Sequence, residues 1–358
     1  MKILIAMDSF KGSLSSMEAG RAAAEGIHRV FPNAECVIRP LADGGEGTVE
    51  ALSEGLGGTI HEIEVTGPMG KPTQAKYALV GNLAVMEMAQ AAGITLVPES
   101  ERNPLKATTY GVGEMILDAI KQGAKEFLIG IGGSATNDAG QGMLKALGEA
   151  WGNIISTDGG GTLSLPYCFR VACDVKNPLC GPNGASAVFG PQKGATPEMV
   201  KELDARLRKF AEESGDPGEM PGDGAAGGLG YAFRRFLNAE LLPGVELVLK
   251  ETRLEEVIKD SDIVITGEGR LDGQTVMGKA PIGVAKLAKK HGKKVIAFCG
   301  CTGEGVRAVN DAGIDAYFPI LHKVTSLEEA LEKSNAAENL TASVEQVFRL
   351  LLSSTLNF

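Results

Sequence analysis

The N-terminal part of the chain alternates short β-branched runs with longer runs of helical spacing. In the first helical run, apolar residues recur at helical spacing, and Ser15 followed by Glu18 is a capping box. The predicted strands span residues 2–7, 36–40 and 61–66, and the predicted helices span residues 15–31 and 48–53. This order is a βαβαβ unit, which indicates a parallel sheet.

The same alternation returns near the C-terminus. Strands are predicted at residues 262–266, 294–298 and 317–320, and helices at residues 280–291 and from Ser326 toward Leu352. Pro281 suits the first turn of one helix, and Ser326 with Glu329 is a second capping box. We therefore predict one doubly wound, Rossmann-like sheet domain, assembled from residues 1–66 and 243–358.

Residues 67–242 have a different pattern and are predicted to form an inserted α/β domain. A hairpin over residues 76–92 turns at Gly81 and Asn82. Residues 214–228, which are rich in proline and glycine, are predicted to be a flexible loop. The predicted fold class is thus α/β with two domains, and the length of 358 residues agrees because it exceeds the size of a single core.

Composition narrows the class of partner. A formal charge of -10 argues against binding to nucleic acid or to an anionic membrane surface. No apolar run approaches the ~18 residues of a membrane span, and the N-terminus lacks a cleavage-site pattern. The 6 cysteines include no CxxC pair, which favours reduced thiols. We expect a cytoplasmic protein with a small-molecule substrate; the oligomeric state stays open.

Polar, glycine-rich loops follow several of the predicted strands. Their candidate residues are Asp8, Ser9, Lys11 and Ser13; Asp43, Gly44, Gly45 and Glu46; Gly132, Gly133, Ser134, Asn137 and Asp138; and Glu268, Arg270 and Asp272. Parallel sheets bind ligands at the carboxyl ends of their strands, so such loops together indicate an enzyme site. Taken singly, the same residue types also serve as helix caps or as solvated turn residues.

The chemistry of these loops excludes some classes of enzyme. The histidines lie outside every glycine-rich loop, which argues against a Ser-His-Asp hydrolase and a His-ligated zinc enzyme. Carboxylates, lysines and an arginine remain, and these are the groups that phosphoryl transfer uses. Two nucleotide motifs are incomplete: residues 273–279 spell GxxxxGK without the following hydroxyl residue, and residues 130–135 spell GxGxxA without a later acidic partner. We interpret the first as a chance match.

Long segments spread over nearly the whole chain resemble the type I glycerate kinase family. They are DSFKGSLS (8–15), PLADGGEGT (40–48), IGIGGSATNDAGQGM (129–143), VACDVKNPLCGPNGA (171–185), FGPQKGA (189–195), PGDGAAGGLG (221–230) and KAPIGVAK (279–286). Asp223 stands where a small residue is usual in that family. The resemblance implies phosphorylation of D-glycerate by ATP with Mg²⁺, in a cleft between the two domains. It implies 2-phosphoglycerate as the product, although the sequence leaves 3-phosphoglycerate open.

Loop position and residue type then indicate roles. Lys11 and Arg270 are the candidate catalytic cations for the glycerate carboxylate and the transferring phosphate. Asp43 and Asp174 are candidates for Mg²⁺ ligands or for the catalytic base, followed by Glu268 and Asp272. The predicted substrate-binding residues are Asp8, Ser9, Lys11, Gly44, Glu268, Arg270 and Asp272. The predicted residues for the nucleotide phosphates are Gly132, Gly133, Ser134, Asn137, Asp138 and Lys193.

Two other functions stay open at this point. The GxGxxA match would suit an NAD-linked hydroxy-acid dehydrogenase. A non-catalytic organic-acid sensor would use the same loops, although several carboxylates beside an anionic ligand bring a receptor no advantage.

Overall fold

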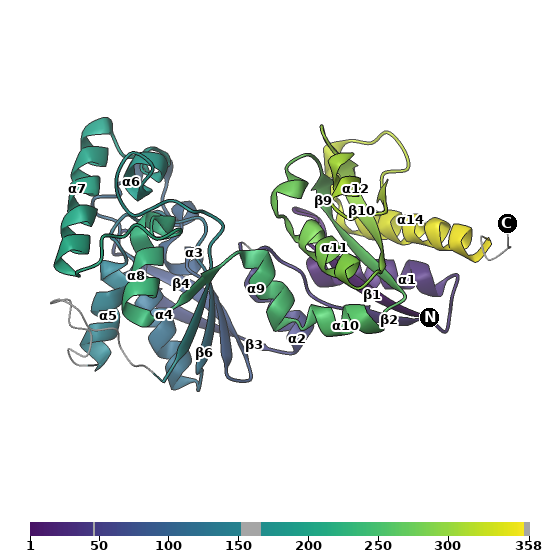
Figure 1. Cartoon of the computed structure of the whole chain (residues 1–358), viewed down its shortest axis with the longest axis horizontal. Helices are drawn as coiled ribbons and strands as arrows, with labels where there is room; N and C mark the ends of the chain where they lie inside the picture. The colour runs from purple at the N-terminus through teal and green to yellow at the C-terminus, as the bar shows by residue number, and fades with distance from the viewer. Residues whose placement is uncertain (46, 152–165, 354–358) are drawn as a thin grey trace. The chain divides into compact units, whose positions relative to one another are not determined.

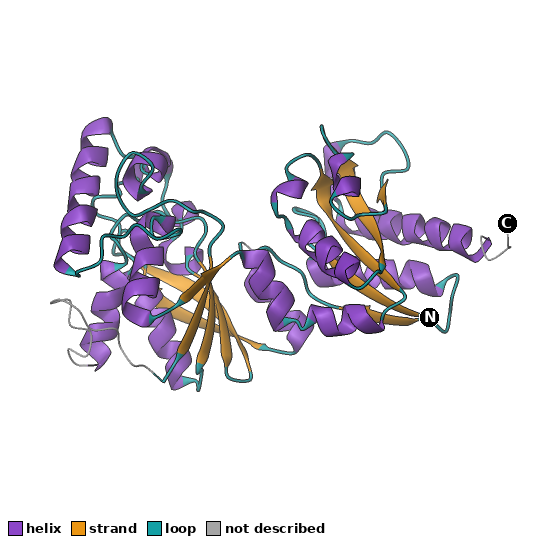
Figure 2. Ribbon diagram, viewed as in Figure 1, coloured by secondary structure: helices purple, strands orange, loops and turns teal. Residues whose placement is uncertain are grey.

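The computed structural model describes residues 1–45, 47–151 and 166–353 and divides into two compact units (Figure 1). Unit 1 comprises Met1–Asp43, Glu54–Gly57 and Val248–Phe358, and unit 2 comprises Gly44–Ser53 and Gly58–Leu247. Each unit combines helices with a β-sheet (Figure 2). The predicted α/β class, with one unit inserted into the other, is confirmed.

The sheet of unit 1 has the strand order β11-β10-β9-β1-β2, and neighbouring strands run parallel. Its strands are β1 (Lys2–Met7), β2 (Glu35–Ile38), β9 (Ile263–Leu271), β10 (Lys294–Thr302) and β11 (Ala316–Pro319). The helices of this unit are α1 (Ser16–His28), α10 (Leu254–Asp260), α11 (Ala280–Lys290), α12 (Ala308–Asp311), α13 (Leu327–Leu331) and α14 (Lys333–Ser353). This strand order is that of a doubly wound sheet, with its chain reversal beside β1.

Alternation along β1 explains how both faces of this sheet are buried. Ile3 and Ile5 pack into a core that α1 and α14 share, whereas Leu4, on the opposite face, is also fully buried. The predicted capping box of Ser15 and Glu18 begins α1 as expected. Its small-residue stripe lets α14 approach closely, because a Cβ on Gly26 would clash with the carbonyl oxygen of Thr341.

The sheet of unit 2 has the order β3-β4-β5-β6-β7-β8 and is mixed. Its strands are β3 (Thr59–Thr66), β4 (Pro72–Val80), β5 (Leu83–Glu87), β6 (Glu126–Gly130), β7 (Cys168–Ala172) and β8 (Glu240–Leu242). Its helices are α3 (Ala89–Ala92), α4 (Tyr110–Lys121), α5 (Gln141–Trp151), α6 (Ala185–Phe189), α7 (Pro197–Glu213) and α8 (Leu229–Leu237). The division between the units passes through α2 (Thr48–Leu56) and α9 (Gly244–Glu251).

The structure corrects the position of one predicted strand. We expected residues 61–66 in the parallel sheet, but β3 pairs antiparallel with β4, from Thr59↔Leu79 to Thr66↔Pro72. The connection between these strands is a short turn, which permits a hairpin but is too short for a parallel crossover. Unit 2 therefore begins before residue 67, at Gly44.

Two further segments differ from expectation. The predicted C-terminal helix is broken at Glu332, whose ψ of 126° is extended, so that α13 and α14 are separate helices. Residues 214–228, predicted as a flexible loop, are tied down by Arg234, which pairs with Asp216 at 2.9 Å and with Asp223 at 2.7 Å. The unusual Asp223 is thus fully buried against a cation, which offsets the cost of burying its charge.

No helix in the described ranges is long and apolar enough to cross a membrane.

The contact of α1 with α14 can be tested by a substitution. Gly26→Ala places a methyl group against Thr341 and is expected to destabilise the protein by about 1–3 kcal/mol. Gly148→Ala is the matched control, since no described atom lies within 4 Å of its added Cβ. That control should stabilise helix α5 by roughly 0.5–1 kcal/mol. Thermal unfolding followed by circular dichroism measures both, and an undiminished Tm for Gly26→Ala would contradict the packing.

Candidate functional site

The candidate site lies at the carboxyl ends of β1 and β9, where the winding of the unit 1 sheet reverses. The two strands pair in parallel from Ile3↔Ile263 to Met7↔Gly267. The pairing continues one residue further, because the amide of Asp8 donates to the carbonyl of Gly267 at 2.8 Å. In doubly wound sheets this reversal opens a crevice that binds ligands.

Strand β9 is longer than predicted, and this places two candidate residues on the strand itself. We expected a loop from residue 267 onward, but β9 continues to Leu271. Glu268 pairs with Cys299 of β10, and Arg270 pairs with Cys301. Because alternate residues of a strand point to the same side, Glu268 and Arg270 are presented on one side of the sheet.

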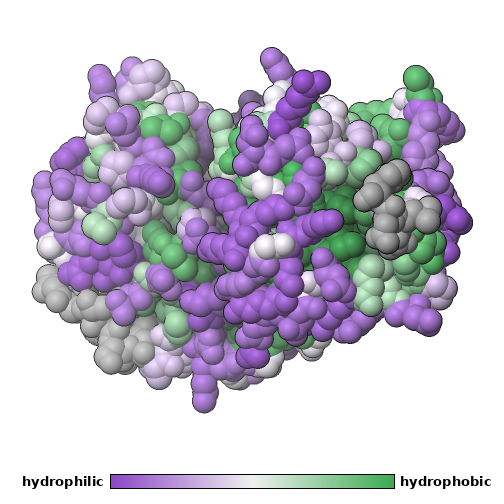
Figure 3. Space-filling model, turned by 45° about the vertical axis from the view of Figure 1, so that its right-hand side comes forward, coloured by the Kyte–Doolittle hydropathy of each residue, from purple (hydrophilic) through white to green (hydrophobic). Residues whose placement is uncertain are grey.

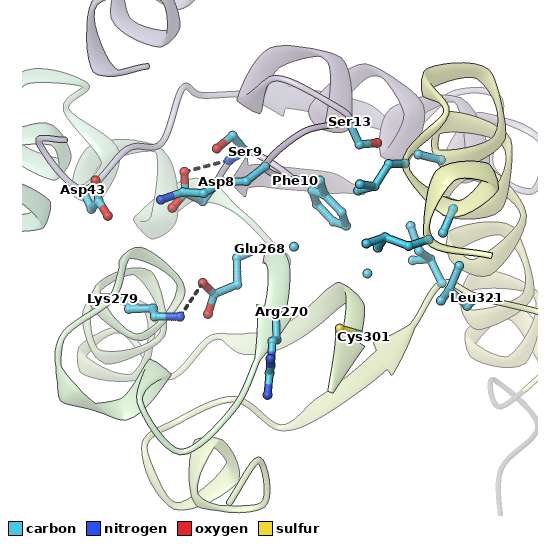
Figure 4. Close-up of a pocket in the computed structure, with 18 residues that line it drawn as sticks. Asp8, Ser9, Phe10, Ser13, Asp43, Glu268, Arg270, Lys279, Cys301 and Leu321 are labelled. Atoms are coloured by element: carbon cyan, nitrogen blue, oxygen red, sulfur yellow. Dashed lines mark hydrogen bonds and ion pairs between the residues drawn. The ribbon is translucent and has the colours of Figure 1, made fainter. Parts of the chain in front are cut away.

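A pocket with a volume of about 340 Å³ opens here, within unit 1 (Figure 4). The predicted residues that line it are Asp8, Ser9, Lys11, Ser13, Asp43, Glu268 and Arg270. Segments from both ends of the chain thus contribute to one pocket, as the sequence analysis required. Three kinds of lining residue were not among the predicted site residues: Lys279, the thiol of Cys301, and an apolar wall that begins with Phe10.

Glu268 is held in place by two donors. The hydroxyl of Thr275 donates to one carboxylate oxygen at 2.7 Å, and the ammonium of Lys279 donates to the other at 3.2 Å (Figure 4). Burial raises the pKa of Glu268, and these two contacts act against the rise. Lys279 is the final residue of the GxxxxGK match that we set aside. The match therefore did contain a residue of the pocket, at the N-cap of α11.

Asp8 has the most perturbed carboxyl group of the pocket. Burial is the main cause that raises the pKa of Asp8 to about 7, and the negative charges of Asp43 and Glu268 contribute to the rise. The amide of Ser9, which donates to Asp8 at 2.7 Å, and the charge of Lys11 both act in the opposite direction. A carboxyl group that titrates near neutral pH in a pocket is suited to exchanging protons.

Two predicted substrate-binding residues lie outside this pocket. Asp272 accepts from the amide of Gln274 at 2.9 Å and forms an ion pair with Arg270 at 3.4 Å, so it orients the guanidinium. Gly44 belongs to unit 2, where its positive φ of 84° and its contact with Ala172 leave no room for a side chain. Glu46 of the same loop lies outside the described residues.

The predicted phosphate-binding residues of unit 2 form a separate group. Lys193 is 2% exposed, and its ammonium donates to the hydroxyl of Ser134 at 2.6 Å and to the carbonyl of Thr136 at 2.7 Å. Burial lowers the pKa of Lys193 to about 7, against the opposing charge of Asp138. Lys193 therefore supports the loop from inside the fold, whereas Gly132 and Gly133 of that loop are exposed.

Asp138 and Asn137 are also engaged within unit 2. Asp138 accepts from the amide and hydroxyl of Thr109 at 2.9 Å and 2.8 Å, and from the amides of Gly140 and Gly142. It thereby joins the starts of α4 and α5, and burial raises its pKa in spite of these donors. Asn137 donates to the hydroxyl of Ser186 at 3.0 Å. These contacts support the structural role that we named as the alternative for such residues.

Asp174 and Asp43, the two predicted metal ligands, belong to different units. Asp174 follows β7, and its carboxylate accepts from the amide of Gly244 at 3.1 Å. The expectation that both aspartates meet in one cleft stays a prediction. Among residues 1–45, 47–151 and 166–353, no group of three His, Cys, Asp or Glu side chains is placed to hold a metal ion. Kinases hold Mg²⁺ with one or two carboxylates together with substrate phosphates, so such a group is not required.

Comparisons with known proteins agree on a family. The sequence model of the glycerate kinase family matches residues 3–352. A glycerate kinase from Halalkalibacterium halodurans is 47% identical, over 93% of this chain and 94% of its own. Glycerate 2-kinase from Escherichia coli is 46% identical, over 96% of this chain and 98% of its own. A crystal structure from Salmonella typhimurium LT2, provisionally named glycerate kinase 2, superposes with a TM-score of 0.87 at 44% identity and covers 100% of both chains.

The perturbed carboxyl group of Asp8 predicts a dependence of stability on pH. Its pKa rises from 3.8 to about 7 on folding, so between these values the native state holds a proton that the unfolded state has lost. Stability therefore falls as the pH rises through this range. Asn cannot ionise, so the Tm of Asp8→Asn minus the Tm of the wild type should increase as the pH rises from about 4 to about 8.

Asp262→Asn is the control for this measurement, because Asp262 lies exposed at the other end of β9, where its carboxylate accepts from the amide of Lys2 at 2.8 Å. Its Tm should follow that of the wild type at each pH. A difference between Asp8→Asn and the wild type that stays constant with pH would show that the carboxyl group of Asp8 titrates normally.

Proposed function

This chain belongs to the glycerate kinase family, and we propose that it transfers the γ-phosphoryl group of ATP to D-glycerate, giving 2-phosphoglycerate. One observation carries the proposal beyond family membership: acidic and basic groups from both ends of the chain line one pocket at the reversal point of the unit 1 sheet. The 46% identity to a protein named glycerate 2-kinase supports transfer to the 2-hydroxyl group.

Lys11 and Arg270 are the proposed cations for the carboxylate of glycerate and for the transferring phosphate. Both are exposed on the pocket, so they can reach a ligand without first leaving a buried partner. The planar guanidinium of Arg270 can bind two oxygens at once, and Asp272 sets its orientation. Lys279 adds a further positive charge from the start of α11.

Asp8 joins Asp43 as a proposed base for the hydroxyl proton of glycerate. Its position in the pocket and its near-neutral pKa of about 7 are those of a group that can accept a proton at the pH of the cell. The sequence analysis treated Asp8 only as a substrate-binding residue. The assignment to a base arises from burial, which a sequence does not display.

The acidic groups of this pocket also fit a divalent cation. The charges of Asp43 and Glu268 both raise the pKa of Asp8, so each repels the carboxylate of Asp8, and a bound cation would relieve that repulsion. Bound Mg²⁺ would neutralise the charge of the nucleotide phosphates. We propose Asp43 as its ligand in unit 1, so that Asp8 can serve as the base for the hydroxyl proton. Three expectations from the sequence stay predictions. They are a metal-binding role for Asp174, a cytoplasmic location, and a role in binding the nucleotide phosphates for Gly132, Gly133, Ser134, Asn137, Asp138 and Lys193.

The dehydrogenase alternative loses its structural support. A dinucleotide fingerprint needs a helix that opens within the glycine motif, directly after the strand. Here β6 ends at Gly130 and α5 begins only at Gln141. The GxGxxA match therefore lacks the strand, turn and helix geometry that gives it meaning.

The product of the reaction tests the proposal directly. The purified protein, incubated with D-glycerate, ATP and Mg²⁺, should form 2-phosphoglycerate and ADP. A phosphorus NMR spectrum distinguishes the product from 3-phosphoglycerate. No transfer from ATP to glycerate would refute the kinase assignment, and a product signal from 3-phosphoglycerate would refute the assignment of the hydroxyl group.

The proposed roles in unit 1 predict a large loss of activity on substitution. Asp8→Asn and Asp43→Asn should each lower kcat/KM by about 10²-fold or more, because each removes a charge that faces the reacting groups. Arg270→Lys should lower it by a similar factor, since an ammonium cannot form the paired hydrogen bonds of a guanidinium. Asp262→Asn, at the opposite end of β9, should leave kcat/KM within about twofold. Steady-state kinetics with ATP and glycerate would decide, and near-normal kcat/KM in the three site variants would contradict these roles.

A further inference from the structure

The pocket of unit 1 has two chemically different halves. Asp8, Asp43, Glu268 and Lys279 lie together on one side of Figure 4, and Phe10 points away from them toward Leu321. The apolar half is completed by Ile320, Leu327, Ala330, Leu331 and Ala336, from the end of β11 and from α13 and α14. Glycerate carries an oxygen on every carbon, so it has no surface to place against this wall.

The apolar wall is partly open to solvent. Leu321 is 38% exposed, Leu327 is 74% exposed and Leu331 is 37% exposed. On the one face that Figure 3 draws, hydrophobic areas lie between hydrophilic ones. Single exposed leucines are ordinary, but several that line one pocket beside charged groups form the kind of surface that ligands cover. A ligand that covers this wall therefore needs a sizeable apolar face.

A buried hydroxyl group borders this apolar half. The hydroxyl oxygen of Ser13 is buried, lines the pocket, and has no hydrogen-bond partner among the described residues. It lies on the same side of the pocket as Phe10 and Leu321 (Figure 4). A buried hydroxyl group without a partner is unfavourable, so it calls for an explanation such as a ligand. The ligand that suits this half thus has an apolar face and a hydrogen-bonding edge.

We propose that this half of the pocket, with Ser13 at its edge, binds the adenine base of ATP. The flat apolar face of a purine can pack against this wall, and its polar edge can form a hydrogen bond with Ser13. The phosphate groups of ATP would be attracted by Lys11, Arg270 and Lys279. The inference rests on the proposed function, in which ATP is the phosphoryl donor, and it assigns the base to unit 1. It makes Ser13 and Leu327 residues that select the donor nucleotide.

Photolabelling of the full chain locates the base. With 8-azidoadenosine triphosphate and light, we expect adducts on peptides that contain residues 10–14 or 320–336, identified by mass spectrometry. Excess ATP should prevent the labelling, and excess glycerate should not. Adducts confined to peptides of unit 2, such as residues 131–140, would overturn the inference and favour the loop after β6 as the nucleotide site.

Steady-state kinetics provide a second readout with a matched pair of variants. Leu327→Glu puts a charge into the apolar wall and should raise the KM for ATP by about tenfold, with a change of less than about twofold in the KM for glycerate. Val324→Glu is the control, since Val324 is fully exposed at 103%, does not line the pocket, and should leave both KM values unchanged. Both positions are exposed enough to accept the charge without disturbing the fold.

Ser13 is tested in the same assay. Ser13→Ala removes the hydroxyl group and should raise the KM for ATP by about fivefold, the effect of one neutral hydrogen bond, and Ser13→Thr should restore it. An unchanged KM for ATP in both Leu327→Glu and Ser13→Ala would overturn the inference while the kinase activity stands. If the wild-type protein transfers no phosphate from ATP to glycerate but is labelled at residues 320–336, the proposed function fails and the nucleotide site remains.

Discussion

The site depends on the parallel pairing of β1 with β9. This pairing joins residues 3–7 to residues 263–267, which lie at opposite ends of the sequence. The close fit allows only glycine at position 267, inside β9, because a Cβ on Gly267 would clash with the carbonyl oxygen of Phe298 in the next strand. Asp8 and Glu268 follow the paired residues directly, so the register of two strands places both carboxyl groups at one pocket. A shift of register by a single residue would turn these side chains to the other face.

Burial of charge at the carboxyl ends of β1 and β9 explains why the pocket contains a carboxyl group with a raised pKa. Carboxyl groups that repel one another are unfavourable for folding, since burial and the neighbouring charges both raise the pKa of Asp8. Lys279 offsets part of this cost for Glu268, and Lys11 does so for Asp8. Such arrangements are typical of functional sites, where a substrate or a cation supplies the remaining compensation.

The loop after β6 shows the same residue types in another role. Asp138 accepts hydrogen bonds from the starts of two helices, and Lys193 is buried beneath the loop with its ammonium bound to Ser134 and Thr136. These contacts leave the backbone of Gly132 and Gly133 exposed while they fix its shape. Charge within a glycine-rich loop thus stabilises the loop in unit 2, whereas it faces an open pocket in unit 1.

Much of the fold could be predicted from local pattern alone. The capping box at Ser15, the hairpin turn at Gly81 and Pro281 in the first turn of α11 are local signals, and the structure confirms the elements that they begin or connect. The family resemblance was equally a property of the sequence, because long motifs survive in order along the chain. The assignment of residues 61–66 to the parallel sheet was wrong, since strand pattern does not specify the partner of a strand.

The amino-acid sequence by itself determined which segments form helices and strands, and which residue types are available for phosphoryl transfer. Only the tertiary structure decided that Asp8 and Lys279 face the pocket with Arg270, and that Lys193 and Asp138 are engaged in contacts within unit 2. The physical reason is that helix and strand preferences act over a few neighbouring residues. Burial, strand partners and pKa values depend on groups that come together only when distant parts of the chain pack.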